Sequence, residues 1–263
     1  AIAAAFTTYF CMYAFRKPFT AAAWAEHEVF GVQGKTALVT AQVLGYTLAK
    51  FLGIAVIGGM RREHRVRLLM ALVAFAELAL LALAVVPPRF GVVSMFFNGL
   101  PLGMVFGLVL GCLEGRRLTE AMTAALCASF ILADGVTKSV GAWLLAVGVQ
   151  DQWMPATAGG LFLLPLAGCA AVLSRSSGPD ATDVALRAER GPMPRAARRR
   201  FARRHATALI GIVGLYLSIT ILRSVRADFA PELWGALGYS GESSVFARSE
   251  ILPGATQRDR DHA

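Results

Sequence analysis

Long apolar segments separated by short polar connections dominate this sequence and limit the folds open to it. A transmembrane helix needs about 20 mostly apolar residues. Seven candidate spans meet this description, near residues 1–24, 37–60, 67–86, 91–113, 121–148, 154–174 and 206–229. Only 16% of the 263 residues are charged, whereas soluble domains average about 25%. The sequence therefore predicts an all-α membrane protein.

The basic residues of the loops lie almost entirely on one side of these predicted spans. Fifteen arginines occupy the loops at 61–67, 116–117 and 175–205, and the opposite loops carry only Lys35 and Arg89. Because cytoplasmic loops are enriched in Lys and Arg, we expect the N-terminus and the 175–205 segment to be cytoplasmic. The placement of these arginines between apolar segments also argues against a nucleic-acid partner, despite the net charge of +9.

The 175–205 segment is the long polar stretch that follows the sixth span, and it contains several Gly and Pro residues. We interpret it as a basic cytoplasmic linker, which could also attract anionic lipid headgroups. It would join an N-terminal six-helix half (1–174) to the start of a second half (206–263). A repeated spacing, Arg-x-x-Phe-x-x-x-x-Trp, supports this division. It occurs in the first span at Arg16, Phe19 and Trp24, and again near the seventh at Arg226, Phe229 and Trp234.

The residues after Trp234 predict an eighth span that stays incomplete. An apolar segment begins near Ser244, but Pro253 and a polar tail follow within about ten residues. A span needs roughly twice that length. We therefore expect a seventh helix, a truncated eighth helix and a chain that is C-terminally truncated.

Charged residues inside the apolar spans are the strongest functional candidates. A charge at the bilayer centre costs about 2.5–3.5 kcal/mol even on insertion scales, so such residues usually face a cavity or a partner. The first span carries two of them and the seventh carries three: Arg16, Lys17, Arg223, Arg226 and Asp228. The alternative for Arg16 and Arg226 is snorkelling toward the interface.

Three further charges lie in the third and fifth spans. Asp134 and Lys138 are four residues apart, so they share one helix face. They form either a structural ion pair or an anion-binding lysine tuned by its aspartate. Glu77 stands alone in its span and is either a proton-carrying group or a partner across helices. In the fourth span, Gly99, Gly103, Gly107 and Gly111 predict close helix packing.

Three short motifs combine these charges with aromatic residues. They are Tyr13-Ala14-Phe15-Arg16-Lys17-Pro18-Phe19, Gly45-Tyr46-Thr47-Leu48-Ala49-Lys50-Phe51, and Leu222-Arg223 with Asp228-Phe229-Ala230-Pro231. They resemble motifs of the organophosphate:phosphate antiporters of the major facilitator superfamily. That resemblance implies a bundle of two six-helix halves and a phosphate clamped by Arg16 and Arg223. Two segments depart from the pattern: 58–62 lacks the usual aspartate, and 113–120 is closer to an uncharacterised bacterial branch of major-facilitator-like proteins.

The expected function is secondary active transport of a small organic anion, phosphorylated compounds included, by alternating access across the bacterial inner membrane. We expect substrate contacts from Arg16, Arg223, Lys17, Arg226 and Lys138, and coupling or ion-pair roles for Asp134, Glu77 and Asp228. The four cysteines lie in apolar runs, which predicts buried thiols and no metal site. We expect a monomer among membrane lipids, with no enzymatic activity and no cofactor. The alternatives are a sensor or receptor with a transporter fold, and a nonfunctional transporter fragment.

Overall fold

The protein is built from helices, which confirms the all-α prediction. The computed structural model describes residues 2–24, 31–57, 60, 62–113, 119–175 and 195–238, and no β-strand occurs among them. The helices are α1 (Ile2–Met12), α2 (Gly34–Ile57), α3 (Arg62–Val85), α4 (Pro88–Leu113), α5 (Thr119–Ala146), α6 (Met154–Arg175), α8 (Arg195–Arg204), α9 (Ala206–Asp228) and α10 (Ala230–Ala236). Two short 3-10 helices, η1 (Tyr13–Phe15) and η2 (Pro18–Ala21), follow α1.

Five of the described helices are long and apolar enough to cross a membrane: α3, α4, most of α5, α6 and α9. The chain is therefore a multi-pass membrane protein, as the apolar segments predicted. Helix α2 has 24 residues but is not among these five helices. The expected first span, 1–24, is wrong as one continuous helix, because α1 ends at Met12 and passes into the two 3-10 turns. Pro18 lacks the backbone N–H that would continue the helix.

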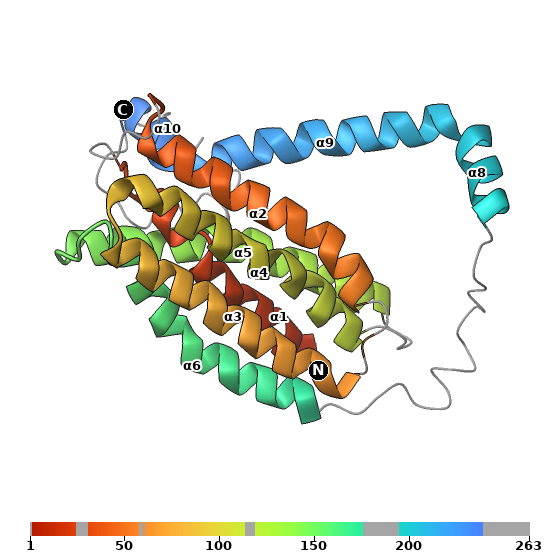
Figure 1. Ribbon diagram of the computed structural model, residues 1–263, viewed down its shortest axis with the longest axis horizontal. Coiled ribbons are helices and arrows are strands. Elements are labelled where there is room, and N and C mark those ends of the chain that lie inside the picture. Colours follow the sequence, from red (N-terminus) through yellow and green to blue (C-terminus); the bar gives the residue numbers. More distant parts are fainter. Residues whose placement is uncertain are drawn as a thin grey trace, which may run out of the picture.

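Helices α1 to α6 form a body in which α4 packs closely on both α2 and α3 (Figure 1). The predicted glycine strip lies at this contact. A Cβ on Gly99 would collide with the backbone of Gln42, and one on Gly103 would lie 2.8 Å from the Cβ of Ala49. Small residues thus bring the backbones of α2 and α4 together, which confirms the packing role of the glycines.

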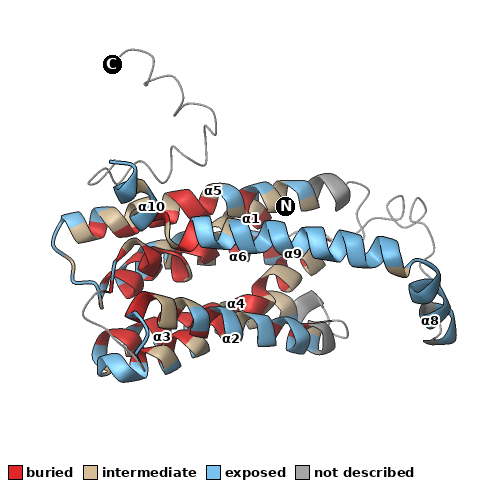
Figure 2. Ribbon diagram, turned by 90° about the horizontal axis from the view of Figure 1, so that it is seen from above, coloured by how far each residue is buried: buried red, intermediate tan, exposed pale blue. Residues whose placement is uncertain are grey.

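Helix α9 lies along the outside of this body. Figure 2 shows it exposed over most of its length, and every described side chain from Thr207 to Leu222 is exposed. Burial begins only at the other end of the helix, where Ala227 and Asp228 are buried. In both views the far end of α9, with α8, projects beyond the body. The firm attachment of α9 is thus at its C-terminal end.

Part of the predicted linker forms a helix. The sequence predicted a basic cytoplasmic linker over 175–205, and within this segment α8 occupies Arg195–Arg204. Residues 176–194 lie outside the described residues, as does the expected eighth helix after residue 238. The predicted division into 1–174, 175–205 and 206–263 stays a prediction.

Candidate functional site

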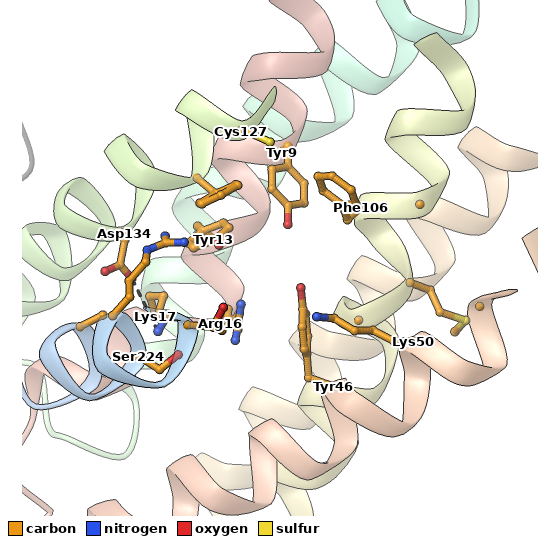
Figure 3. Close-up of a pocket in the computed structure, with 18 of the residues that line it drawn as sticks. Tyr9, Tyr13, Arg16, Lys17, Tyr46, Lys50, Phe106, Cys127, Asp134 and Ser224 are labelled. Carbon is orange, nitrogen blue, oxygen red and sulfur yellow. Dashed lines mark ion pairs between the residues drawn. The ribbon is translucent and has the colours of Figure 1, made fainter. Parts of the chain in front are cut away.

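A cavity of about 700 Å³ opens between α9 and helices α1, α2, α4 and α5 (Figure 3). Its charged lining residues are four cations and one carboxylate: Arg16, Lys17, Lys50, Arg223 and Asp134. Its aromatic lining residues are Tyr9, Tyr13, Tyr46, Phe106, Phe130 and Tyr216. The hydroxyl groups of Tyr9 and Tyr46 point toward one another. The cavity therefore combines excess positive charge with an aromatic wall.

The break after α1 places Arg16 and Lys17 at this cavity. A broken helix leaves carbonyl oxygens without intrahelical partners, which is costly inside a membrane protein. The Asn98 amide donates to the Phe15 oxygen at 3.1 Å, and the Gln42 amide donates to the Arg16 oxygen at 3.1 Å. Gln42 also donates to Asn98 at 2.7 Å, and Asn98 donates to Ala76 of α3 at 3.0 Å. Two buried amides thus fix the irregular backbone that carries both cations.

Four buried charges form a network where the α1 break meets the end of α9. Lys17 forms an ion pair with Asp228 and lies 3.6 Å from Asp134 Oδ1. Asp134 accepts a hydrogen bond from Lys138 at 2.8 Å, and Lys138 also donates to the backbone oxygen of Ala227. Each charged group is therefore compensated, which burial requires. The Asp134–Lys138 pair predicted from spacing is present, and α9 supplies its unforeseen partners.

A second ion pair ties α10 to the start of α2. Lys35 Nζ lies 2.6 Å from one carboxylate oxygen of Glu232 and 2.8 Å from the other. The lysine side chain is buried, whereas that of Glu232 is 45% exposed. The end of α9 and the α10 that follows it are thus attached at two separate places.

The other three cations of the cavity pack against aromatic rings. The guanidinium carbon of Arg16 lies 4.1 Å from the centre of the Tyr46 ring, and that of Arg223 lies 4.5 Å from Phe130. Lys50 Nζ lies 4.7 Å from the centre of the Tyr46 ring. Arg16 and Lys50 lie on opposite sides of Tyr46 (Figure 3). Within the part of the chain that the structure describes, no carboxylate lies within 4.0 Å of these three cations.

The Arg16 side chain also has unused hydrogen-bonding capacity. Its Nε is buried and has no hydrogen-bond partner among the described residues. Aromatic stacking orients a guanidinium but leaves its N–H groups available at the edge of the plane. Arg16 is therefore held in place by Tyr46, and its Nε donor lacks an acceptor among the described residues.

The structure brings most of the predicted site residues together. Arg16, Lys17, Asp134 and Arg223 line the cavity. Lys138 and Asp228 lie behind it in the ion-pair network. Two residues lie elsewhere. Arg226 is exposed and does not line the cavity, so the structure gives no support to its predicted substrate contact. Glu77 of α3 packs against Gly159 of α6.

Several site residues were not predicted, although the sequence held a signal for some of them. Tyr9 and Tyr13 precede Arg16 by seven and three residues, which is the spacing of one helix face. Lys50 is a charge inside an apolar span, the same criterion that selected the others. Gln42 and Asn98 carry no charge, and their role depends on a helix break that periodicity does not reveal.

Among the residues that the structure describes, no three His, Cys, Asp or Glu side chains are grouped to hold a metal ion. The described lining of the cavity supplies cations, phenols, aromatic rings and the carboxylate of Asp134.

Residues 18–256 match the profile of a family of unknown function (DUF5690). The chain belongs to this family. The match covers every described α-helix except α1, together with most residues of the cavity. No curated protein and no solved structure is detectably similar to the chain.

Proposed function

We propose that this chain belongs to a secondary transporter of the major facilitator type that moves a small organic anion by alternating access. In this proposal α1 to α6 are the first six-helix half and α9 is the seventh helix. The N-terminus and α8 face the cytoplasm of a bacterial cell, in line with the Lys/Arg bias of the loops. The protein acts on its substrate without chemical conversion.

The excess of cations at one cavity is the observation that carries the proposal. Lys17 and Lys138 are compensated by Asp134 and Asp228, whereas Arg16, Lys50 and Arg223 face the cavity without a carboxylate partner among the described residues. Cations in a low-dielectric site repel one another and favour an anion between them. The proposed substrate supplies that missing negative charge.

The type of cation favours an oxyanion. A guanidinium presents paired donors in a plane that matches the oxygens of a carboxylate or phosphate. Arg16 comes from the break after α1 and Arg223 from α9, so one anion held by both arginines would bridge the two proposed halves. The tyrosine hydroxyls add neutral donors, and the aromatic wall suits the organic part of the substrate.

Binding to the purified chain tests the site. We expect inorganic phosphate and glycerol 3-phosphate to bind in isothermal titration calorimetry, and uncharged glycerol not to bind. Arg16→Lys and Arg223→Lys keep the charge but lose the paired donors. Each should weaken binding about ten-fold or more, the value of charge-assisted hydrogen bonds.

Arg89→Lys is the matched control, because Arg89 is exposed and lies outside the cavity. Unchanged affinity in folded Arg16→Lys and Arg223→Lys proteins would refute the clamp. Counterflow of labelled substrate in proteoliposomes then tests transport. Binding without counterflow would favour a sensor that keeps the transporter fold.

A further inference from the structure

Helix α8 carries a dense cationic face that has no role in the cavity. Arg199 and Arg203 are four residues apart, as are Arg200 and Arg204, so the two pairs form adjacent rows. All four side chains are exposed, and together with Ala196 they line one hollow. Like charges at this spacing destabilise a helix by themselves. The face is therefore suited to an anionic partner.

No described carboxylate supplies that partner. Among the described residues, none of the ion pairs involves Arg199, Arg200, Arg203 or Arg204. The helix also packs on little besides the beginning of α9. Helix α8 as a whole lies away from the protein body (Figure 1).

The position of α8 along the chain indicates where its arginines lie relative to the membrane. Only His205 separates α8 from α9, which is long and apolar enough to cross a membrane. Helix α8 has ten residues, or about 15 Å at 1.5 Å per residue, and cannot itself cross a core about 30 Å thick. Both views show α8 turned away from the direction of α9. A short helix that turns at the end of a span lies at the membrane surface.

We propose that α8 is an anionic-phospholipid binding site, whose arginine face holds the phosphate-bearing headgroups of the leaflet around the end of α9. Guanidinium groups bind phosphate oxygens through paired donors. A bilayer with anionic lipids has a negative surface potential that attracts basic segments next to a span.

The side of α8 beside the arginine face fits the same position. Ala197 and Phe201 are one turn apart, and Phe201 is exposed. The Phe201 ring lies 4.7 Å from that of His205, at the junction with α9. Interfacial helices place aromatic and aliphatic side chains at the boundary of the acyl chains while their cations remain among the headgroups. The site would hold the free end of α9 at the membrane surface, whatever the cavity binds.

Hydrogen–deuterium exchange of the full chain in nanodiscs tests the site. Amides of residues 195–204 should exchange about ten-fold more slowly in discs with 30% phosphatidylglycerol than in phosphatidylcholine discs. High salt should remove the difference, because exposed charges are screened. The double variant Arg199→Gln/Arg203→Gln should also remove it.

The matched control is Arg67→Gln/Arg89→Gln, which removes two exposed arginines elsewhere and should leave the exchange of 195–204 unchanged. Equal exchange in both lipids would overturn the proposal. So would protection that persists in the α8 double variant. Inorganic phosphate or an RNA oligonucleotide that protects α8 equally well in phosphatidylcholine discs would assign the face to a free anion or to nucleic acid instead.

Discussion

The six-helix body and α9 hold their positions in different ways. In the body, glycines bring α2 against α4, and two buried amides bind the broken end of α1. Helix α9 has no described buried side chain before Ala227, and charged contacts near its C-terminal end attach it to the body. The body is thus fixed by close packing, and α9 by electrostatic contacts at one end.

Because of this difference, the two arginines of the cavity are held to different degrees. Arg16 is fixed by groups that all belong to the body. Arg223 reaches the same cavity from a helix that Lys17 and Lys138 contact at its C-terminal end, and Lys35 holds the α10 that follows it. One arginine of the proposed clamp is therefore carried by a rigid element, and the other by an element that fewer contacts hold.

The largest effect should follow loss of the carboxylate shared by two buried lysines. Asp134→Asn leaves Lys138 without its ion pair and Lys17 with Asp228 alone. Breaking a buried ion pair costs about 3–5 kcal/mol, which corresponds to a fall of about 10 °C in Tm for a chain of this size. Heating in detergent with a fluorogenic maleimide measures it through the buried thiols of Cys11 and Cys112.

The control for this change is Asp151→Asn, because Asp151 is exposed in the turn before α6. It should leave Tm within about 2 °C. Equal values of Tm for Asp134→Asn and the unaltered protein would show that the network does not join α9 to the body.

Glycine substitutions in α4 and in α9 should change Tm in different directions, by smaller amounts than Asp134→Asn. Gly99→Ala places a Cβ against the Gln42 backbone, and such overpacking costs about 1–3 kcal/mol. Gly211→Ala on α9 meets no atom within 4 Å, and Ala favours a helix over Gly by about 1 kcal/mol. We expect opposite shifts of Tm. The same fall in both variants would mean that α9 is packed as tightly as α4.

The smallest effect should come from the partly exposed ion pair of α10. Glu232→Gln removes a charge from a side chain that is 45% exposed, and exposed ion pairs contribute about 0–1 kcal/mol. Overall Tm should barely change, but amides of 230–236 should exchange faster while those of α4 do not. Faster exchange throughout the body would contradict the local role of this contact.

The helices could be predicted from sequence wherever apolar length decided the structure. The expected spans 91–113, 154–174 and 206–229 differ from α4, α6 and α9 by at most three residues at either end. The first span was wrong as one helix because the mostly apolar sequence continues to Trp24, whereas the α-helix ends at Met12 and short 3-10 turns follow it on either side of Arg16. Hydropathy indicates whether a segment is apolar enough to lie in the membrane, but it does not indicate where the α-helical backbone ends.

The site could be predicted in part, and the limit was sequence separation. Spacing within one helix predicted that Asp134 and Lys138 would meet. The Lys17–Asp228 pair joins residues 211 positions apart, and no local pattern predicts such a contact. The same holds for Gln42 of α2 and Asn98 of α4, which donate hydrogen bonds to the broken backbone that follows α1.

The meeting of Lys17 with Asp228 has a consequence for water. Both side chains are buried, and each neutralises the other where the α1 break meets the end of α9. Separating the two elements would uncover both charges, and an uncovered buried charge is stable only when solvent replaces its partner. Any outward swing of α9 would therefore have to draw solvent into the junction. Osmolytes that lower the activity of water should then slow this movement of α9, and the effect should grow with the number of water molecules that enter the junction.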